Sequence, residues 1–276
     1  MQKPLPLNPT HVRKVIPKII EWVKEKKPFA LVRMSEGESR VLHVNVLRPE
    51  SFGVAARKIL KQTGICVSHT DVLTIQKLIR DAFTEADILA ITGSDSWNKE
   101  YRMWMDRLKD QYAILRTKPC ITTHCFINRQ IRDHLPIILK GHTKVSVISC
   151  RNLKPYLKET CGITDVVTYQ VPSQYIMRNI DDEYEKCLHD VKMWPTAHHK
   201  IIKEIQVRER GEVFLIGAGL FGKDMCIRVR DLGGIALDLG SCLDSIVGKT
   251  TRGDGKPTPF SGPKPKDGKP KVEKPK

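Results

Sequence analysis

An arginine and two carboxylates follow the first strongly apolar run of the chain. Residues 29–32 are Phe-Ala-Leu-Val, Arg33 comes next, and Glu36 and Glu38 lie on either side of Gly37. Mg²⁺ and Mn²⁺ prefer oxygen ligands and are often held by one or two carboxylates together with substrate phosphates. An arginine beside such a cation can pair with phosphate oxygens. The segment therefore predicts a metal site for a phosphorylated ligand; the alternative is an acidic helix start, where Glu favours the positive end of the helix dipole.

A glycine-rich loop near residue 220 is the second feature that could do chemistry. Gly217, Gly219 and Gly222 follow an apolar run and open a helical pattern, and Asp238 ends the next apolar run about 20 residues later. Backbone amides at such a helix start can approach a pyrophosphate because no side chain intervenes. Taken alone, this spacing predicts an NAD(P)-dependent oxidoreductase that uses the Gly-Ala-Gly-Leu-Phe-Gly loop.

The position of this loop in the chain favours a smaller ligand. A dinucleotide fold needs further strand–helix units after its acidic residue, but only the residues 239–248 separate Asp238 from a basic tail. What remains is one mononucleotide-type half, which suits a nucleoside diphosphate. The alternative is that the glycines only allow a helix to pack against a strand.

Strand and helix patterns alternate along the chain. Apolar runs that predict strands lie at residues 29–34, 88–93, 118–122, 144–149, 165–169, 213–216 and 235–237. Helical patterns lie within residues 1–27 and at 37–47, 52–63, 71–83, 98–111, 128–139, 153–159, 181–189 and 221–232. The helix at 181–189 is expected to resume after Pro195 and to continue through Arg208. This order predicts an α/β fold, with a mainly parallel central sheet and helices on both faces. Ligands of such sheets bind at the carboxyl ends of the strands, where both motifs lie.

Composition limits the class of protein. The 276 residues are 40% apolar, without the run of roughly 20 apolar residues that a membrane span needs and without the apolar core of a signal peptide. The eight cysteines show no paired spacing, so we expect neither a disulfide framework nor a zinc ribbon. We expect a cytoplasmic protein.

The net charge of +16 is shared between the body and the tail of the chain. From Lys249 onward nine basic and three acidic residues give +6, which leaves +10 for the rest. A basic surface attracts nucleic acid, anionic lipid or nucleotide phosphates without choosing among them. A non-catalytic nucleic-acid-binding protein is therefore a further alternative. Residues 253–276 are rich in Pro and Lys and are expected to be disordered, with possible peripheral contact with anionic surfaces.

The motifs together resemble a known family. The segment from Arg33 to Glu38 resembles the Arg-aromatic-Gly-Asp-Gly-Glu segment of the GT-D type glycosyltransferases, whose Asp-Xaa-Glu motif carries the metal and the donor diphosphate. Further similar stretches run in the family's order at residues 91–93, 127–129, 147–153, 171–173, 217–222 and 233–241, followed by Asp244, Gly248, Lys249 and Arg252. The resemblance implies an N-terminal helical lead-in at 1–27, a Rossmann-like GT-D domain at 28–252, and the tail.

The resemblance implies a metal-dependent glycosyltransferase that uses Mn²⁺ or Mg²⁺. It would transfer a sugar from a nucleotide sugar, with a UDP-sugar as the first expectation, to an acceptor hydroxyl. The acceptor would be a saccharide, a lipid-linked saccharide or a nucleic acid. Glu36 and Glu38 would bind the cation, which stabilises the departing diphosphate as a Lewis acid. Arg33 and Arg151 would lie near the phosphates, and Asp238 would act as the base or contact a sugar hydroxyl.

The remaining family positions complete the expected site. Gly217, Gly219 and Gly222 would line the nucleotide side, and Lys249 and Arg252 would clamp the diphosphate or simply begin the tail. The chain departs from the family pattern in having Glu36 in place of Asp, Met34 in place of an aromatic residue and Ser35 in place of glycine. The alternative to an enzyme is an inactive relative that binds the nucleotide sugar.

Overall fold

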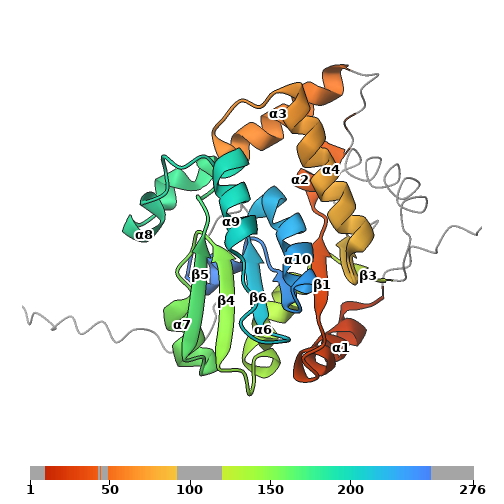
Figure 1. Ribbon diagram of the computed structural model, residues 1–276, viewed down its shortest axis with the longest axis vertical. Coiled ribbons are helices and arrows are strands. Elements are labelled where there is room, and N and C mark those ends of the chain that lie inside the picture. Colours follow the sequence, from red (N-terminus) through yellow and green to blue (C-terminus); the bar gives the residue numbers. More distant parts are fainter. Residues whose placement is uncertain (1–9, 43, 45–48, 92–119, 250–276) are drawn as a thin grey trace, which may run out of the picture.

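The computed structural model describes residues 10–249, apart from 43, 45–48 and 92–119 and the side chains of 36, 49, 176 and 180 (Figure 1). The helix predicted at 98–111 and the tail predicted to be disordered lie outside the described residues, as does Arg252.

A single parallel sheet forms the centre of the described structure. Its seven strands are β1 (Phe29–Arg33), β2 (Ile88–Ile91), β3 (Ile121–His124), β4 (Lys144–Ser149), β5 (Asp165–Gln170), β6 (Val213–Gly217) and β7 (Ile235–Asp238). Their order in the sheet is β3-β2-β1-β7-β6-β4-β5, and every neighbouring pair is parallel. The predicted α/β fold with a parallel sheet is confirmed.

Helices cover both faces of this sheet (Figure 1). On one face lie α1 (Val12–Lys24), α6 (Ile127–Ile138), α7 (Lys154–Cys161) and α11 (Cys242–Ile246). On the other lie α2 (Glu36–Leu42), α3 (Pro49–Thr63), α4 (His69–Glu85), α9 (His198–Glu204) and α10 (Gly222–Asp231). The prediction of helices on two faces is therefore also confirmed.

Alternating burial explains why the apolar runs become strands. In β1, Ala30 and Val32 join the core under α4 and α10, whereas Phe29 and Leu31 join the core under α1 and α6. Successive side chains of a strand point to opposite faces, and a parallel sheet covered on both faces buries both sets. The ends of the strands are thus fixed, and so are the residues that follow them.

The region between β5 and β6 differs from the prediction of a long helix. It contains the 3-10 helix η1 (Tyr175–Ile180), the four-residue α8 (Glu183–Lys186) and the turn η2 (Met193–Ala197), and only α9 follows, ending at Glu204. Trp194 has a non-helical backbone (φ −112°, ψ 135°), because a residue before proline disfavours the helical region. The predicted helix at 181–189 is confirmed only as the short α8, and the helix predicted to resume after Pro195 is α9, which ends at Glu204 rather than at Arg208. The sequence patterns do not predict η1 and α11.

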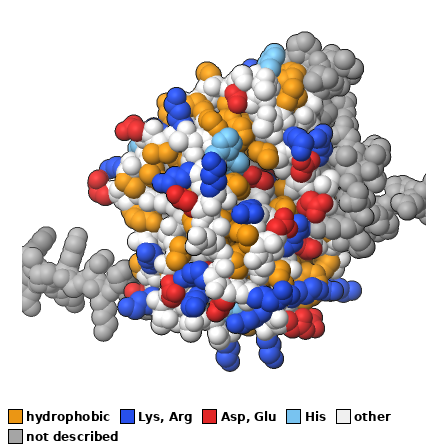
Figure 2. Space-filling view, in the orientation of Figure 1, with side chains coloured by type: hydrophobic (Ala, Val, Ile, Leu, Met, Phe, Trp, Pro, Cys, Tyr) orange, Lys and Arg blue, Asp and Glu red, His pale blue; other side chains and the backbone are white. Residues whose placement is uncertain are grey.

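The surface carries both signs of charge. Figure 2 shows acidic and basic side chains interspersed over one face, with several basic ones along its lower edge. Among the described residues, every helix is too short or too polar to cross a membrane.

Candidate functional site

A pocket lies at the carboxyl ends of β1, β4, β6 and β7. The residues that line it come from the strand ends, from the loops that follow them and from α2, α3, η1, α10 and α11: Arg33, Ser35, Glu38, Gln62, Cys150, Arg151, Gln174, Met177, Gly217, Gly219, Lys223, Gly240, Ser241 and Asp244. This is the edge at which ligands of parallel sheets bind. Five of the sequence-predicted site residues are among them: Arg33, Glu38, Arg151, Gly217 and Gly219.

Arg33 is fixed at the end of β1. Its Nε donates to the carbonyl of Cys125 (3.0 Å) and its Nη1 to the carbonyl of Leu239 (3.1 Å). Gly240, with φ +52°, allows this approach, since a Cβ there would lie 2.6 Å from Arg33 Nη1. A positive charge is thereby held in one orientation at the pocket wall, and its predicted contact with phosphate stays untested.

Glu38 lies in the first turn of α2 and is almost completely buried. Its Oε2 accepts hydrogen bonds from the Ser35 amide (2.9 Å) and from the Ser35 hydroxyl, and its Oε1 lies 3.2 Å from Lys223 Nζ. Burial raises the pKa of this carboxyl, but the Lys223 ammonium and the bonds from Ser35 outweigh it and lower the pKa to about 2. Glu38 is thus ionised.

Lys223 is the residue that sequence reasoning missed. It is the second residue of α10, directly after the glycine loop, and its buried ammonium forms ion pairs with Glu38 and Asp238. Burial lowers its pKa, but the charges of Asp238 and Glu38 reverse this effect and raise it. A signal existed in the spacing Gly-x₄-Gly-Lys from Gly217 to Lys223, which is that of phosphate-binding loops, although Asp224 stands where those loops have Ser or Thr.

Asp238 ends β7, as predicted, but is not part of the pocket lining. Its Oδ2 accepts from the Arg33 amide (3.1 Å) and from the Lys223 ammonium. In this arrangement Asp238 positions Lys223, and its role as the base stays a prediction.

Of the two predicted metal ligands, the structure describes only the side chain of Glu38. Both Glu38 oxygens have protein partners, and one of these partners is a cation. Within the described ranges, no group of three His, Cys, Asp or Glu side chains is placed to hold a metal ion. Glu36 begins α2, but its side chain is outside the described part. The Mn²⁺ or Mg²⁺ ion remains a prediction.

The glycine loop both shapes the pocket and packs the fold. A Cβ on Gly217 would lie 2.7 Å from Leu243 Cδ1, and one on Gly219 (φ +58°) would lie 2.7 Å from Gln62 Oε1. These two glycines line the pocket, whereas Gly222 lies outside the lining, where a Cβ would be 3.0 Å from Ile216 Cγ2. Packing thus accounts for the glycine at all three positions, and two of them also line the pocket.

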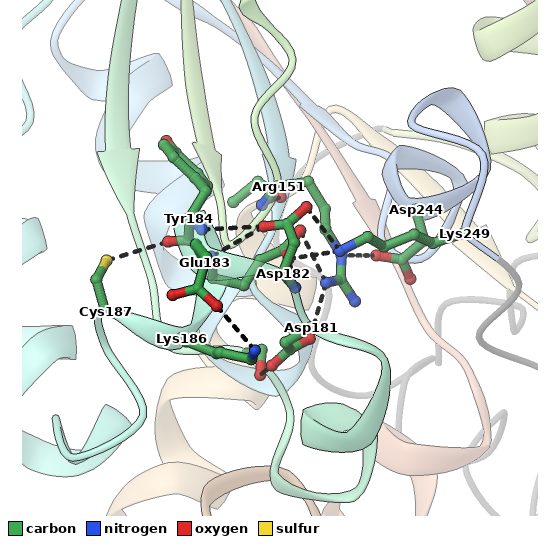
Figure 3. Close-up of polar contacts among 12 residues, drawn as sticks. Arg151, Asp181, Asp182, Glu183, Tyr184, Lys186, Cys187, Asp244 and Lys249 are labelled. Carbon is green, nitrogen blue, oxygen red and sulfur yellow. Dashed lines mark hydrogen bonds and ion pairs between the residues drawn. The ribbon is translucent and has the colours of Figure 1, made fainter. Parts of the chain in front are cut away.

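Arg151 reaches the pocket wall, but its guanidinium belongs to a cluster of carboxylates (Figure 3). Its Nη1 lies 3.0 Å from Asp181 and 3.1 Å from Glu185, and its Nε donates to Asp244 (2.7 Å). Lys249 also joins this cluster, through Glu185 and Asp182, and lies outside the pocket lining. Arg151 and Lys249 therefore share Glu185 as a partner. Their predicted contacts with phosphate stay untested.

Comparison with known proteins gives a family and a fold. The family model of the GT-D fold-like domain matches residues 10–246. A solved structure described as "The highly conserved domain of unknown function 1792 has a distinct glycosyltransferase fold" superposes with a TM-score of 0.52 at 12% identity, over 86% of this chain and 79% of that chain. A selenomethionine-substituted structure of domain of unknown function 1792 gives 0.48 at 13% identity with the same coverage. No curated protein matches the chain.

Proposed function

Because the chain belongs to the GT-D fold-like family and has a glycosyltransferase fold, we propose that it is a glycosyltransferase. Its donor is a nucleotide sugar, with UDP-sugars the first class to test, and its acceptor is a hydroxyl group. The observation that carries the proposal is the pocket at the carboxyl edge of the sheet, where Arg33, Lys223 and the Gly217–Gly219 backbone meet.

The charges of the pocket suit a nucleoside diphosphate as leaving group. In the transfer, the bond between the anomeric carbon and the diphosphate oxygen breaks and its electron pair leaves with the diphosphate. The acceptor oxygen bonds to the anomeric carbon and gives its proton to a base. Fixed cations near the leaving oxygen stabilise the charge that develops there, and they act most strongly in a site that excludes water. Arg33 meets this requirement, since two backbone carbonyls fix its orientation.

Nucleotide release from a panel of UDP- and other nucleotide sugars, with Mn²⁺ or with EDTA, tests the proposal. We expect release of the nucleotide from one donor class, faster with the acceptor present. Arg33→Ala should reduce the rate at least tenfold, because it removes a fixed cation from the pocket. Lys200→Ala, on the exposed surface of α9, is the control and should leave the rate unchanged. Absence of release from all donors, together with NADH binding, would favour the oxidoreductase alternative.

A further inference from the structure

Lys223 pairs with Glu38, one of the two carboxylates from which the sequence predicts a metal site. Its Nζ lies 3.2 Å from Glu38 Oε1 and also pairs with Asp238, which ends the neighbouring strand. We infer that Lys223 is a phosphate-binding residue: a tethered cation that contacts the donor diphosphate in place of a divalent metal ion. The inference rests on the proposed function in that it requires a diphosphate in the pocket.

The ammonium is buried on one side and lines the pocket on the other. Only 5% of the Lys223 side chain is exposed, yet it is part of the pocket wall together with Arg33 and Gly219. An ammonium has three N–H donors, and within the described residues two carboxylates accept from it. One donor is therefore left for an oxygen of a ligand in the pocket.

A metal ion would have to compete with this ammonium for the same oxygens. Glu38 Oε2 is taken by the Ser35 amide and hydroxyl, and Asp238 Oδ2 by the Arg33 amide and Lys223. A divalent cation placed against Glu38 and Asp238 would lie next to the ammonium and be repelled by it. The protein thus supplies at this point a positive charge that no chelator can remove.

The position of Lys223 in the chain supports contact with phosphate. It follows a loop whose Gly217 and Gly219 line the pocket. In phosphate-binding loops of the same spacing, the lysine after the last glycine reaches the terminal phosphates, and the next Ser or Thr binds Mg²⁺. Here the next residue is Asp224, whose Oδ2 lies 2.7 Å from His198 Nε2, so this side chain is committed to another partner.

Calorimetric titration with UDP and with inorganic pyrophosphate, in EDTA and in Mn²⁺, tests the inference on the full chain. We expect the wild type to bind both probes with the same affinity in EDTA and in Mn²⁺. Lys223→Ala should weaken binding at least tenfold in EDTA, and Mn²⁺ should restore part of it, because the change vacates a place between two carboxylates. A purely structural lysine would show no recovery by metal.

Arg208→Ala is the matched control, since it also removes a cation from between two carboxylates but at the opposite edge of the sheet. It should leave binding of both probes within twofold of the wild type. If Lys223→Ala does not fold, as judged by circular dichroism, the charge-balanced pair Glu38→Gln with Lys223→Gln replaces it, and the same tenfold loss is expected in EDTA.

Three results would overturn the inference: wild-type binding that disappears in EDTA and returns with Mn²⁺, binding by the folded Lys223 variants within twofold of the wild type, or no binding of either probe. Turnover measured in parallel separates the two proposals. Release of nucleotide only with Mn²⁺ would support the proposed transferase activity and contradict the proposal that Lys223 replaces the metal ion. Lys223-dependent binding of pyrophosphate without turnover of any nucleotide sugar would support phosphate binding by Lys223 and contradict the proposed transferase activity.

Discussion

One cation between two carboxylates occurs at both edges of the sheet. At the amino edge, Arg208 pairs with Asp165, the first residue of β5, and with Glu212, directly before β6. At the carboxyl edge, Lys223 pairs with Glu38 and Asp238. In sequence, the Gly-x₄-Gly-Lys spacing before Lys223 distinguishes the two sites, and in the fold their surroundings do.

The difference lies in how the donors of each cation are used. Arg208 gives its Nε and Nη2 to Glu212, its Nη1 to Asp165 and its own amide to Glu212 Oε2. A guanidinium has a planar fork of donors that suits carboxylates, whereas an ammonium is a compact point charge. The side-chain donors of Arg208 are bound within the protein, whereas Lys223 has one N–H left for a ligand in the pocket. The same arrangement of charges thus joins loops at the amino edge and leaves a cation at the pocket at the carboxyl edge.

Arg151 lies at the carboxyl edge but resembles Arg208 in its use. Three carboxylates, on Asp181, Glu185 and Asp244, surround its guanidinium and tie the segment after β5 to α11 (Figure 3). We therefore interpret the Arg151 cluster as a structural support of the pocket wall.

The largest effect is expected for Arg151→Met. The change leaves three carboxylates, two of them buried, without their common cation, and breaking a buried pair in this way costs about 3–5 kcal/mol. Urea denaturation should show this loss in the free energy of unfolding. Asp244→Asn, which removes only the most exposed of the three charges, should cost less than half as much. A loss below about 1 kcal/mol for Arg151→Met would contradict the structural interpretation of this cluster.

Arg208→Ala is expected to have the next largest effect, and it tests directly whether the ion pairs at the amino edge are only structural. Glu212 is fully buried and would lose its main charge partner, although Ser146 Oγ still donates to it (2.7 Å). We expect a loss of about 3 kcal/mol in the free energy of unfolding with unchanged binding of UDP. Weaker UDP binding by a folded Arg208→Ala protein would show that the two edges are coupled.

Glu38→Gln should change how stability depends on pH. The pKa of Glu38 falls from its ordinary 4.5 to about 2 in the fold. A lowered pKa stabilises the fold fully above pH about 4.5, and the contribution is lost as the pH falls toward 2. At neutral pH the free energy of unfolding of the wild type should exceed that of Glu38→Gln by about 3 kcal/mol. Urea denaturation should show this difference disappearing toward pH 2. A constant difference over this range would contradict the assignment, and Glu204→Gln, at an exposed position of α9, controls for the loss of one charge.

These cases also show what the sequence can predict. The seven strands and most helices follow from alternating burial, as in Ala30 and Val32 on one face and Phe29 and Leu31 on the other. The strand ends therefore place Arg33 and Asp238 correctly, because both directly end an apolar run. The sequence does not disclose that residues 38, 223 and 238 meet, since the contact depends on how β1, β7 and α10 are arranged in the sheet.

The resemblance to the family predicts Arg151 and Lys249 at the phosphates, and the sequence does not disclose the carboxylates that they contact in the fold. All of these partners except Asp244 lie in a segment for which helical spacing predicts one long helix. Asp182 instead caps a short one, accepting from the amides of Tyr184 and Glu185. A local cap of this kind competes with continuation of a helix. Charge alone cannot tell whether an arginine pairs with a ligand or with carboxylates brought together by the fold.

Glycine substitutions give the smallest effect and the finest test of the two edges. Gly219 (φ +58°) lines the pocket, and Gly162 (φ +70°) ends α7 just before β5, with open space around its Cβ position. Alanine at either site adopts a left-handed backbone at a cost of about 1 kcal/mol, so both variants should unfold at similarly reduced urea concentrations. Only Gly219→Ala should also weaken UDP binding, because its Cβ displaces Gln62, whose Oε1 accepts from the Leu220 amide (3.1 Å). Equal UDP affinity in the two variants would mean that the loop serves packing alone, and that phosphate recognition falls to the side chains of Arg33 and Lys223.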